Sequence, residues 1–226
     1  MTLPSLFLSH GAPTLPLTET PAREFLKTLG GTLERPKAIL VVSAHWETMV
    51  PTVNAVEFND TIHDFGGFPR QLYQMRYPAP GSPALAARVA ELLTAAGFAC
   101  AIDRKRGLDH GAWVPLSLIY PKADIPVLQL SVQTHLGPEH HLRVGQALAA
   151  LRDEGVLIIG SGSFTHDLSE FRGHGPNDPA PAWVNSFADW FDAALTRDDI
   201  GALLDYRRQA PYATKNHPSE EHLLPI

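Results

Sequence analysis

Cysteine is almost absent from this sequence, because Cys100 is the only one among 226 residues. A single thiol cannot form an internal disulfide, and its apolar surroundings, Gly-Phe-Ala-Cys-Ala-Ile, are typical of a small core residue. The common metal-binding patterns are missing too, since the sequence has neither a paired C-x-x-C nor an H-E-x-x-H motif. Any metal site must therefore be assembled from residues that lie far apart in the sequence.

An excess of basic residues is also lacking, because 18 Lys and Arg against 24 Asp and Glu give a formal net charge of −6. Without a basic cluster that could neutralise a run of phosphates, nucleic acid is not an expected partner. No apolar run approaches the roughly 20 residues of a membrane-spanning helix, and the N-terminus lacks the pattern of a signal peptide. We expect a soluble cytoplasmic protein that has no membrane partner.

Low-complexity tracts are absent, and the 44% of hydrophobic residues is enough for a sizeable core, so we expect one domain over residues 1–226. Short runs rich in Val, Ile and Leu predict strands at 6–8, 38–42, 127–130 and 156–159. Apolar residues at helical spacing predict helices over 83–96, 139–151 and 182–195. Alternating strands and helices indicate an α/β fold with a mainly parallel central sheet and helices on both faces. Two Pro- and Gly-rich stretches, 64–82 and 173–181, are expected to be long loops.

Histidine is the abundant metal-ligating residue, with 11 in the chain. His10, His45 and His166 each follow a predicted strand. Ligands bind beyond the carboxyl ends of the strands in open parallel sheets, so one sheet edge should collect all three side chains. Each could instead be an ordinary loop histidine, but three at equivalent positions favour a metal site.

The remaining histidines are less informative in sequence. His110 lies in a turn before a predicted short helix, where it could simply cap the helix. His217 and His222 are five residues apart and cannot share a helix face, so at most one of them is expected to be a ligand. Four further histidines in polar surroundings are expected to be solvated, namely His135, His140, His141 and His174.

Six short motifs occur in one order along the chain. They are SHGAP around His10, VVSAHW around His45, TIHDFGGFPRQLYQMRYPAPG over 61–81, GLDHGAWVPL around His110, GSGSFTHDL around His166, and HPSEEHLLP near the end. With these motifs the chain resembles the class III extradiol dioxygenases, and within them the branch that is similar to DOPA 4,5-dioxygenase. The resemblance covers essentially the whole chain. Family members usually continue for a few dozen residues beyond the final motif, so the C-terminal end of the family domain is expected to lie after Ile226.

The resemblance implies roles for particular residues. His10, His45 and His222 would bind the metal, and His166 would be a fourth ligand or an acid/base. His110 would hydrogen-bond dioxygen or substrate, and as a catalytic pair His166 and His110 would move protons. Related protocatechuate-cleaving enzymes use a glutamate as third ligand, so Glu221, next to His222, remains an alternative to it.

The implied reaction inserts both atoms of O₂ into a catechol, a DOPA-like compound or another catecholic acid, and opens its ring. Fe(II) would be the active cofactor, and Zn(II) fits the same ligands. Trp46, His63, Phe65 and Trp113 are candidates for contact with the substrate, although aromatic residues are more often core. A zinc-dependent hydrolase and a non-catalytic metal-binding protein of the same fold are the alternatives.

Overall fold

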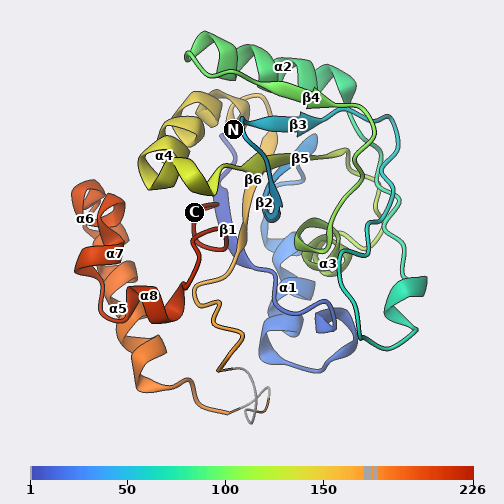
Figure 1. The fold of residues 1–226 in the computed structure, drawn as a ribbon. Helices are drawn as coiled ribbons and strands as arrows, with labels where there is room; N and C mark the ends of the chain where they lie inside the picture. The colour runs from blue at the N-terminus through green and yellow to red at the C-terminus, as the bar shows by residue number, and fades with distance from the viewer. Residues whose placement is uncertain (1, 171–174, 176–177) are drawn as a thin grey trace.

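The computed structural model describes residues 2–170, 175 and 178–226, and it has a twisted central sheet with helices on both faces (Figure 1). The strands are β1 (Ser5–Ser9), β2 (Ala38–Glu47), β3 (Thr52–Asn54), β4 (Ala101–Asp103), β5 (Val127–Val132) and β6 (Val156–Gly162). The helices are α1 (Pro21–Thr32), α2 (Pro83–Ala95), α3 (His110–Ile119), α4 (Gly137–Leu148), α5 (Ala182–Thr196), α6 (Ile200–Leu204), α7 (Tyr206–Gln209) and α8 (Ala213–Asn216). Single turns of 3₁₀ helix lie at Leu15–Leu17, Leu72–Gln74, Thr134–Leu136 and Ala149–Arg152. None of the described helices is long and apolar enough to cross a membrane.

The strand order is β1-β6-β2-β5-β3-β4, and each neighbouring pair is parallel except β3 and β5, which are antiparallel. The predicted α/β class with a mainly parallel sheet is therefore confirmed. Strands β1, β6, β2 and β5 run in the same direction, so their carboxyl ends lie along one edge of the sheet.

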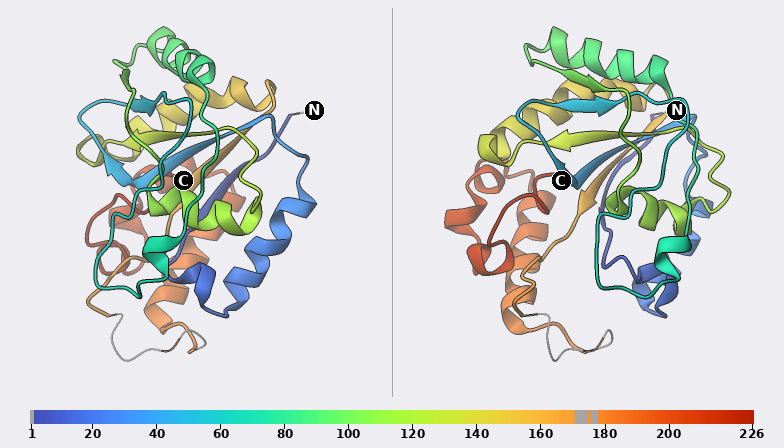
Figure 2. Two further views of the ribbon diagram at one scale, coloured as in Figure 1. Left: turned by 90° about the vertical axis from the view of Figure 1, so that its right-hand side faces the viewer. Right: turned by 45° about the vertical axis from the view of Figure 1, so that its right-hand side comes forward.

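Alternating side chains of the central strands build two cores on opposite faces of the sheet. Ile39 and Val41 of β2 belong to the core shared with α1 and α3, whereas Leu40 packs on the other face against α2 and α4. Both faces of the strand are therefore buried, as its continuous apolar run predicted. Figure 2 shows the helices on the two sides of the sheet.

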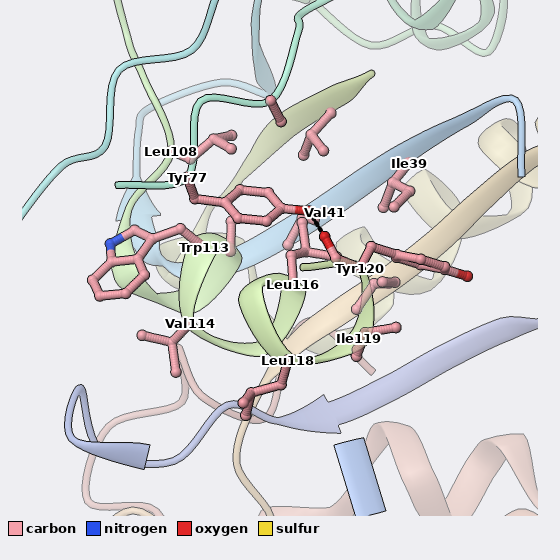
Figure 3. Close-up of a cluster of buried hydrophobic side chains, with 14 of the residues drawn as sticks. Ile39, Val41, Tyr77, Leu108, Trp113, Val114, Leu116, Leu118, Ile119 and Tyr120 are labelled. Atoms are coloured by element: carbon pink, nitrogen blue, oxygen red, sulfur yellow. Dashed lines mark hydrogen bonds between the residues drawn. The ribbon is translucent and has the colours of Figure 1, made fainter. Parts of the chain in front are cut away.

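Helix α3 is apolar on every side, and all but one of its ten residues are buried. Figure 3 shows the core around it, in which the Tyr77 hydroxyl donates a hydrogen bond of 3.0 Å to the Tyr120 carbonyl. Because this helix is enclosed, its first residue, His110, is held on a rigid element.

A third apolar cluster joins α5 to the last residues of the chain. Phe187 and Phe191 of α5 pack with Tyr206 and Leu223. Leu223 follows His222 directly, so this cluster anchors the segment that carries the last histidine.

Candidate metal centre

The carboxyl ends of three parallel strands bring histidines together. His10 directly follows β1, and His166 lies four residues beyond the end of β6. His45 was expected just beyond its strand, but β2 continues to Glu47, with an irregular register between Ser43 and Glu47, so His45 lies inside the strand.

Three imidazole nitrogens converge at this edge of the sheet. The Nε2 atom of His45 lies 2.9 Å from Nε2 of His10 and 3.3 Å from Nε2 of His222. Among the described residues, these three histidines form one of three groups of side chains that could hold a metal ion, and it is the one made of imidazoles alone; the others are His45, Asp64 and His110, and His166, Glu221 and His222. His10 and His222 are buried, and the His45 side chain is 22% exposed, so the group is reached from one side.

The far nitrogens of two of these rings are hydrogen-bonded. Ser161 Oγ donates to the Gly111 carbonyl, so it accepts a 3.0 Å bond from Nδ1–H of His10. Nδ1 of His222 lies 3.0 Å from a carboxylate oxygen of Glu221, which can only accept. Both neutral rings therefore carry their hydrogen on Nδ1 and direct an Nε2 lone pair into the centre.

This donor set fits a divalent metal ion. Nε2 of His45 lies 2.9 and 3.3 Å from the two nitrogens that carry these lone pairs, and when its own hydrogen is on Nδ1 all three nitrogens can donate a lone pair to one shared cation. Metal–nitrogen distances of about 2.0–2.1 Å separate neighbouring ligand atoms by roughly 2.9–3.4 Å in octahedral or tetrahedral geometry. Partners on the distal nitrogens orient metal-binding histidines in the same way.

Burial keeps two imidazoles of the group, those of His45 and His10, neutral. It is the main cause that lowers the pKa of His45 to about 3, and the neighbouring His110 and His222 lower it further. Burial, followed by the charges of His45 and His222, also holds the pKa of His10 well below its ordinary value. Metal coordination requires the unprotonated form, so the folded chain presents ligands that are ready to bind.

His110 lies beside the three converging nitrogens. Its ring centroid is 3.9 Å from that of His45 and 5.4 Å from that of His10. Nδ1 of His110 lies 2.9 Å from Oδ2 of Asp64, and the same carboxylate oxygen is 4.0 Å from Nδ1 of His45. Burial acts to raise the pKa of Asp64, but hydrogen bonds and the charge of His110 outweigh it and lower the pKa overall.

His166 stacks on His222 and does not belong to the converging group. The two ring centroids are 3.4 Å apart and the planes differ by 11°. Burial, and then the charge of His222, lower the pKa of His166 to about 4. Nδ1 of His166 lies 3.8 Å from Glu221, whose pKa is lowered to about 2, mainly by its hydrogen bond with His222.

Beside these rings the surface is hollowed. An open depression is lined by Ala44, His45, Glu47, His166, Ser219, Glu221 and His222. Two histidines of the converging group therefore share with His166 a space that a small molecule can enter.

The backbone around His166 is held by the segment that precedes His222. The His166 N–H donates to the Asn216 carbonyl at 2.7 Å, and the buried His217 places Nε2 3.0 Å from the Phe164 carbonyl. Of the two histidines near the end of the chain, only His222 joins the converging group.

The four residues predicted to contact substrate lie in different settings. Phe65 is half-buried, and its ring centroid lies 5.7 Å from that of His110. The ring centroid of His63 lies 5.7 Å from that of Phe65. Trp46 is buried, with the Arg106 guanidinium 4.5 Å above its ring. Trp113 has no exposed surface and donates its indole N–H to the Ile62 carbonyl, so its placement does not support direct contact with a substrate.

One histidine that was expected to be solvated is not. His141 Nδ1–H donates to the Gly137 carbonyl at 2.7 Å, and Nε2 accepts from the Gln133 N–H at 3.1 Å. His140 is half-buried with Nε2 3.0 Å from the Gln133 side-chain oxygen, whereas His135 is exposed as predicted. His174 lies outside the described residues.

Two polar residues of the centre, Asp64 and Ser161, were missed in the sequence as functional candidates, and Glu221 was considered only as an alternative metal ligand. Each of the three contacts the Nδ1 atom of a clustered histidine. Sequence offered a partial signal, because Ser161 ends an apolar run and Asp64 begins a long loop inside a motif.

The family model described as the catalytic LigB subunit of aromatic ring-opening dioxygenase matches residues 5–226. The chain belongs to this family. This dioxygenase is 51% identical to the 4,5-DOPA dioxygenase extradiol of Beta vulgaris over 227 residues, which cover 98% of the chain and 84% of the relative. It is 44% identical to the protein of the same name from Escherichia coli (strain K12), over 99% of the chain and 83% of the relative.

A solved structure agrees with this assignment. The crystal structure of an uncharacterized protein from Escherichia coli K12 superimposes with a TM-score of 0.79 at 38% identity, and covers 99% of the dioxygenase and 86% of that chain. The resemblance to the class III extradiol dioxygenases is thus confirmed, and the protein is an extradiol aromatic ring-opening dioxygenase. Family membership also argues against the zinc hydrolase alternative.

Proposed function

We propose that this enzyme opens the ring of a DOPA-like catechol, or of another catecholic acid, at one Fe(II) held by Nε2 of His10, His45 and His222. The convergence of these three nitrogens at 2.9 and 3.3 Å carries the proposal. The substrate class is supported by the printed names of the relatives from Beta vulgaris, Mirabilis jalapa and Escherichia coli.

When bound, Fe(II) supplies open coordination positions and the redox chemistry that allows an aromatic ring to react with dioxygen. Zn(II) fits the same three nitrogens but has no redox chemistry, so the zinc form should not open rings. The protein contributes a set of three imidazoles, of which His10 is oriented by Ser161 and His222 by Glu221.

We assign His166 to proton transfer and not to a fourth ligand position. The lone pair of an imidazole lies in the ring plane, and the planes of His166 and His222 are stacked nearly parallel. The lone pairs of these two rings therefore lie in separate, nearly parallel planes and do not converge. His166 lines the open depression, where a neutral ring can accept a proton from a catechol hydroxyl and later return it.

His110 is the second proposed acid/base. Its buried ring lies against His45 at the N-terminus of α3. A side chain held on an enclosed helix keeps its position during turnover, which general acid and base catalysis requires.

Anaerobic reconstitution with Fe(II), followed by oxygenated buffer and a panel of catechols that includes DOPA, tests the proposal. Oxygen uptake and a yellow ring-opened product are expected with Fe(II) and not with Zn(II). Absence of uptake with every catechol would overturn the proposal, and ester or amide cleavage by the zinc form would favour the hydrolase. His135→Ala, at an exposed histidine outside the group, is the matched control and should behave as the wild type.

A further inference from the structure

Asp64 makes two contacts with a single residue from a distant part of the fold. One carboxylate oxygen accepts a hydrogen bond of 3.0 Å from the backbone N–H of His110, and the other lies 2.9 Å from Nδ1 of the same residue. The two side chains are 22% and 8% exposed, so water competes little for these bonds.

Asp64 fills a capping position that the local sequence leaves empty. Asp109 is the N-cap residue of α3, but its side chain makes no capping hydrogen bond. Its carboxylate is instead bonded to Ser43, Gln129 and Arg106 at 2.8–2.9 Å. The first N–H of α3 is therefore satisfied from another loop, and that loop sets the orientation of His110.

The contact also determines where the ring of His110 carries its hydrogen. An ionised carboxylate can only accept, so Nδ1 of His110 must be protonated. A neutral imidazole has one N–H, so Nε2, which points away from Asp64, keeps its lone pair. The rings of His45 and His10 lie 3.9 and 5.4 Å from this ring, so His110 borders the same centre.

We propose that Asp64 is a positioning residue of the ring-opening reaction, which holds His110 in the tautomer that presents an unprotonated Nε2 to the centre. The inference rests on the proposed function. In this tautomer His110 can accept the proton of a catechol hydroxyl; the oxygen keeps the electron pair, and the resulting imidazolium remains bonded to Asp64 through Nδ1. The other tautomer would present an N–H and could not accept.

Asp64→Asn should change the tautomer of His110 without changing the shape of the site. The amide oxygen can still accept from the His110 backbone N–H, while the amide N–H₂ donates to Nδ1 of the ring. Both contacts are kept, but the hydrogen of His110 is moved to Nε2. In serine proteases, replacing the aspartate that orients the catalytic histidine by asparagine likewise keeps the geometry and gives the wrong histidine tautomer.

Nuclear magnetic resonance of histidine-¹⁵N-labelled, Zn(II)-loaded protein reads the tautomer without any turnover. The wild type should show Nδ1–H at His110, assigned by comparison with His110→Ala, and Asp64→Asn should show Nε2–H. Nε2–H in the wild type, or no change in the variant, would overturn the proposal. Because no catechol is involved, this result is independent of whether the enzyme opens rings.

Kinetics of the Fe(II) form then test the consequence. Asp64→Asn should retain one metal per chain and lower kcat by roughly 10²-fold, the low end for a positioned acid/base group, with KM little changed. In a His110→Ala background the same substitution should cause no further loss, since Asp64 acts through His110. An equal loss in both backgrounds, or a loss explained by missing metal, would contradict the proposal.

Asp60→Asn provides the matched control, because it makes the same chemical change at an exposed aspartate four residues earlier in the loop. It should leave the tautomer and kcat as in the wild type. If wild-type protein opens no catechol ring while its His110 shows Nδ1–H, the proposed function fails and the assignment of Asp64 to the tautomer stands.

Discussion

The rings of His166 and His222 lie face to face, with centroids 3.4 Å apart and planes within 11° of each other. A proposed proton-transfer group is therefore packed directly on a proposed metal ligand. Glu221 contacts the Nδ1 side of both rings, at 3.0 Å for His222 and 3.8 Å for His166. One carboxylate thus orients His222 by a hydrogen bond and lies beside His166.

His166→Ala should separate proton transfer from metal binding. Because His166 is not among the converging nitrogens, the variant should retain one metal per chain. Its kcat should fall by about 10²–10⁴-fold, the usual contribution of a general acid or base. Metal analysis and steady-state oxygen uptake measure the two quantities, with His135→Ala as the control. Loss of the metal together with activity would show that His166 is a ligand.

His45→Ala should abolish metal retention. Its Nε2 lies within 3.3 Å of both partner nitrogens, so its removal leaves only two ligands. Metal that binds only the folded protein stabilises it by about 3–4 kcal/mol at 100–1,000 times Kd. Thermal unfolding with and without Zn(II) should show a higher Tm for the wild type and no change for His45→Ala. Normal metal retention by the variant would disprove the ligand assignment.

The fold of the central sheet could be predicted because three of its strands, β2, β5 and β6, are buried on both faces, so that their apolar runs are continuous. Strands β3 and β4 have only three residues each, too short to carry a periodic pattern. Helix α3 was expected only as a short helix after a turn, because its sequence contains Pro115 and is apolar throughout. Enclosure by neighbouring elements, and not an amphipathic pattern, stabilises it.

The site could be predicted only in part, because some of its residues are marked by their local sequence and others are brought there only by the fold. Positions directly after or near the end of a parallel strand mark His10, His45 and His166 in the sequence. His222 does not follow a strand in the sequence. It reaches the centre because the C-terminal segment packs against the end of β6. Asp64 and Glu221 acquire their roles from contacts with the rings of His110 and His222. The fold brings Asp64 close to His110, and the sequence around a loop carboxylate does not indicate which ring it will contact.

Gly162→Ala should disturb the metal centre through the backbone. A Cβ at Gly162 would lie 2.0 Å from the His222 carbonyl oxygen, which also accepts a hydrogen bond from the Ser163 N–H at 2.8 Å. The segment carrying His222 must move, at a cost of about 1–3 kcal/mol in the free energy of unfolding. Urea unfolding and Zn(II) titration should show lower stability and weaker binding.

Gly145→Ala is the control for that change, because nothing lies within 4 Å of its Cβ position in α4. Alanine should stabilise the helix by up to about 1 kcal/mol and leave metal binding unchanged. Equal metal affinity in Gly162→Ala and Gly145→Ala would mean that close packing against β6 does not position His222.

His141 should make the stability of the protein depend on pH at a place outside the metal centre. Burial lowers its pKa from 6.5 to about 4, and a proton on Nε2 would also break the hydrogen bond from the Gln133 N–H. Between these two values the unfolded chain binds a proton that the folded chain does not, so stability should fall as the pH falls from 6.5 towards 4. This shift in pKa corresponds to roughly 3 kcal/mol at most in the free energy of unfolding.

Urea unfolding of metal-free protein at a series of pH values tests this prediction. The free energy of unfolding should depend less steeply on pH for His141→Gln than for the wild type. Gln146→Ala, on an exposed position of the same helix, changes no titratable group and should retain the wild-type slope. Equal slopes for all three proteins would show that His141 is protonated as readily in the folded chain as in the unfolded one.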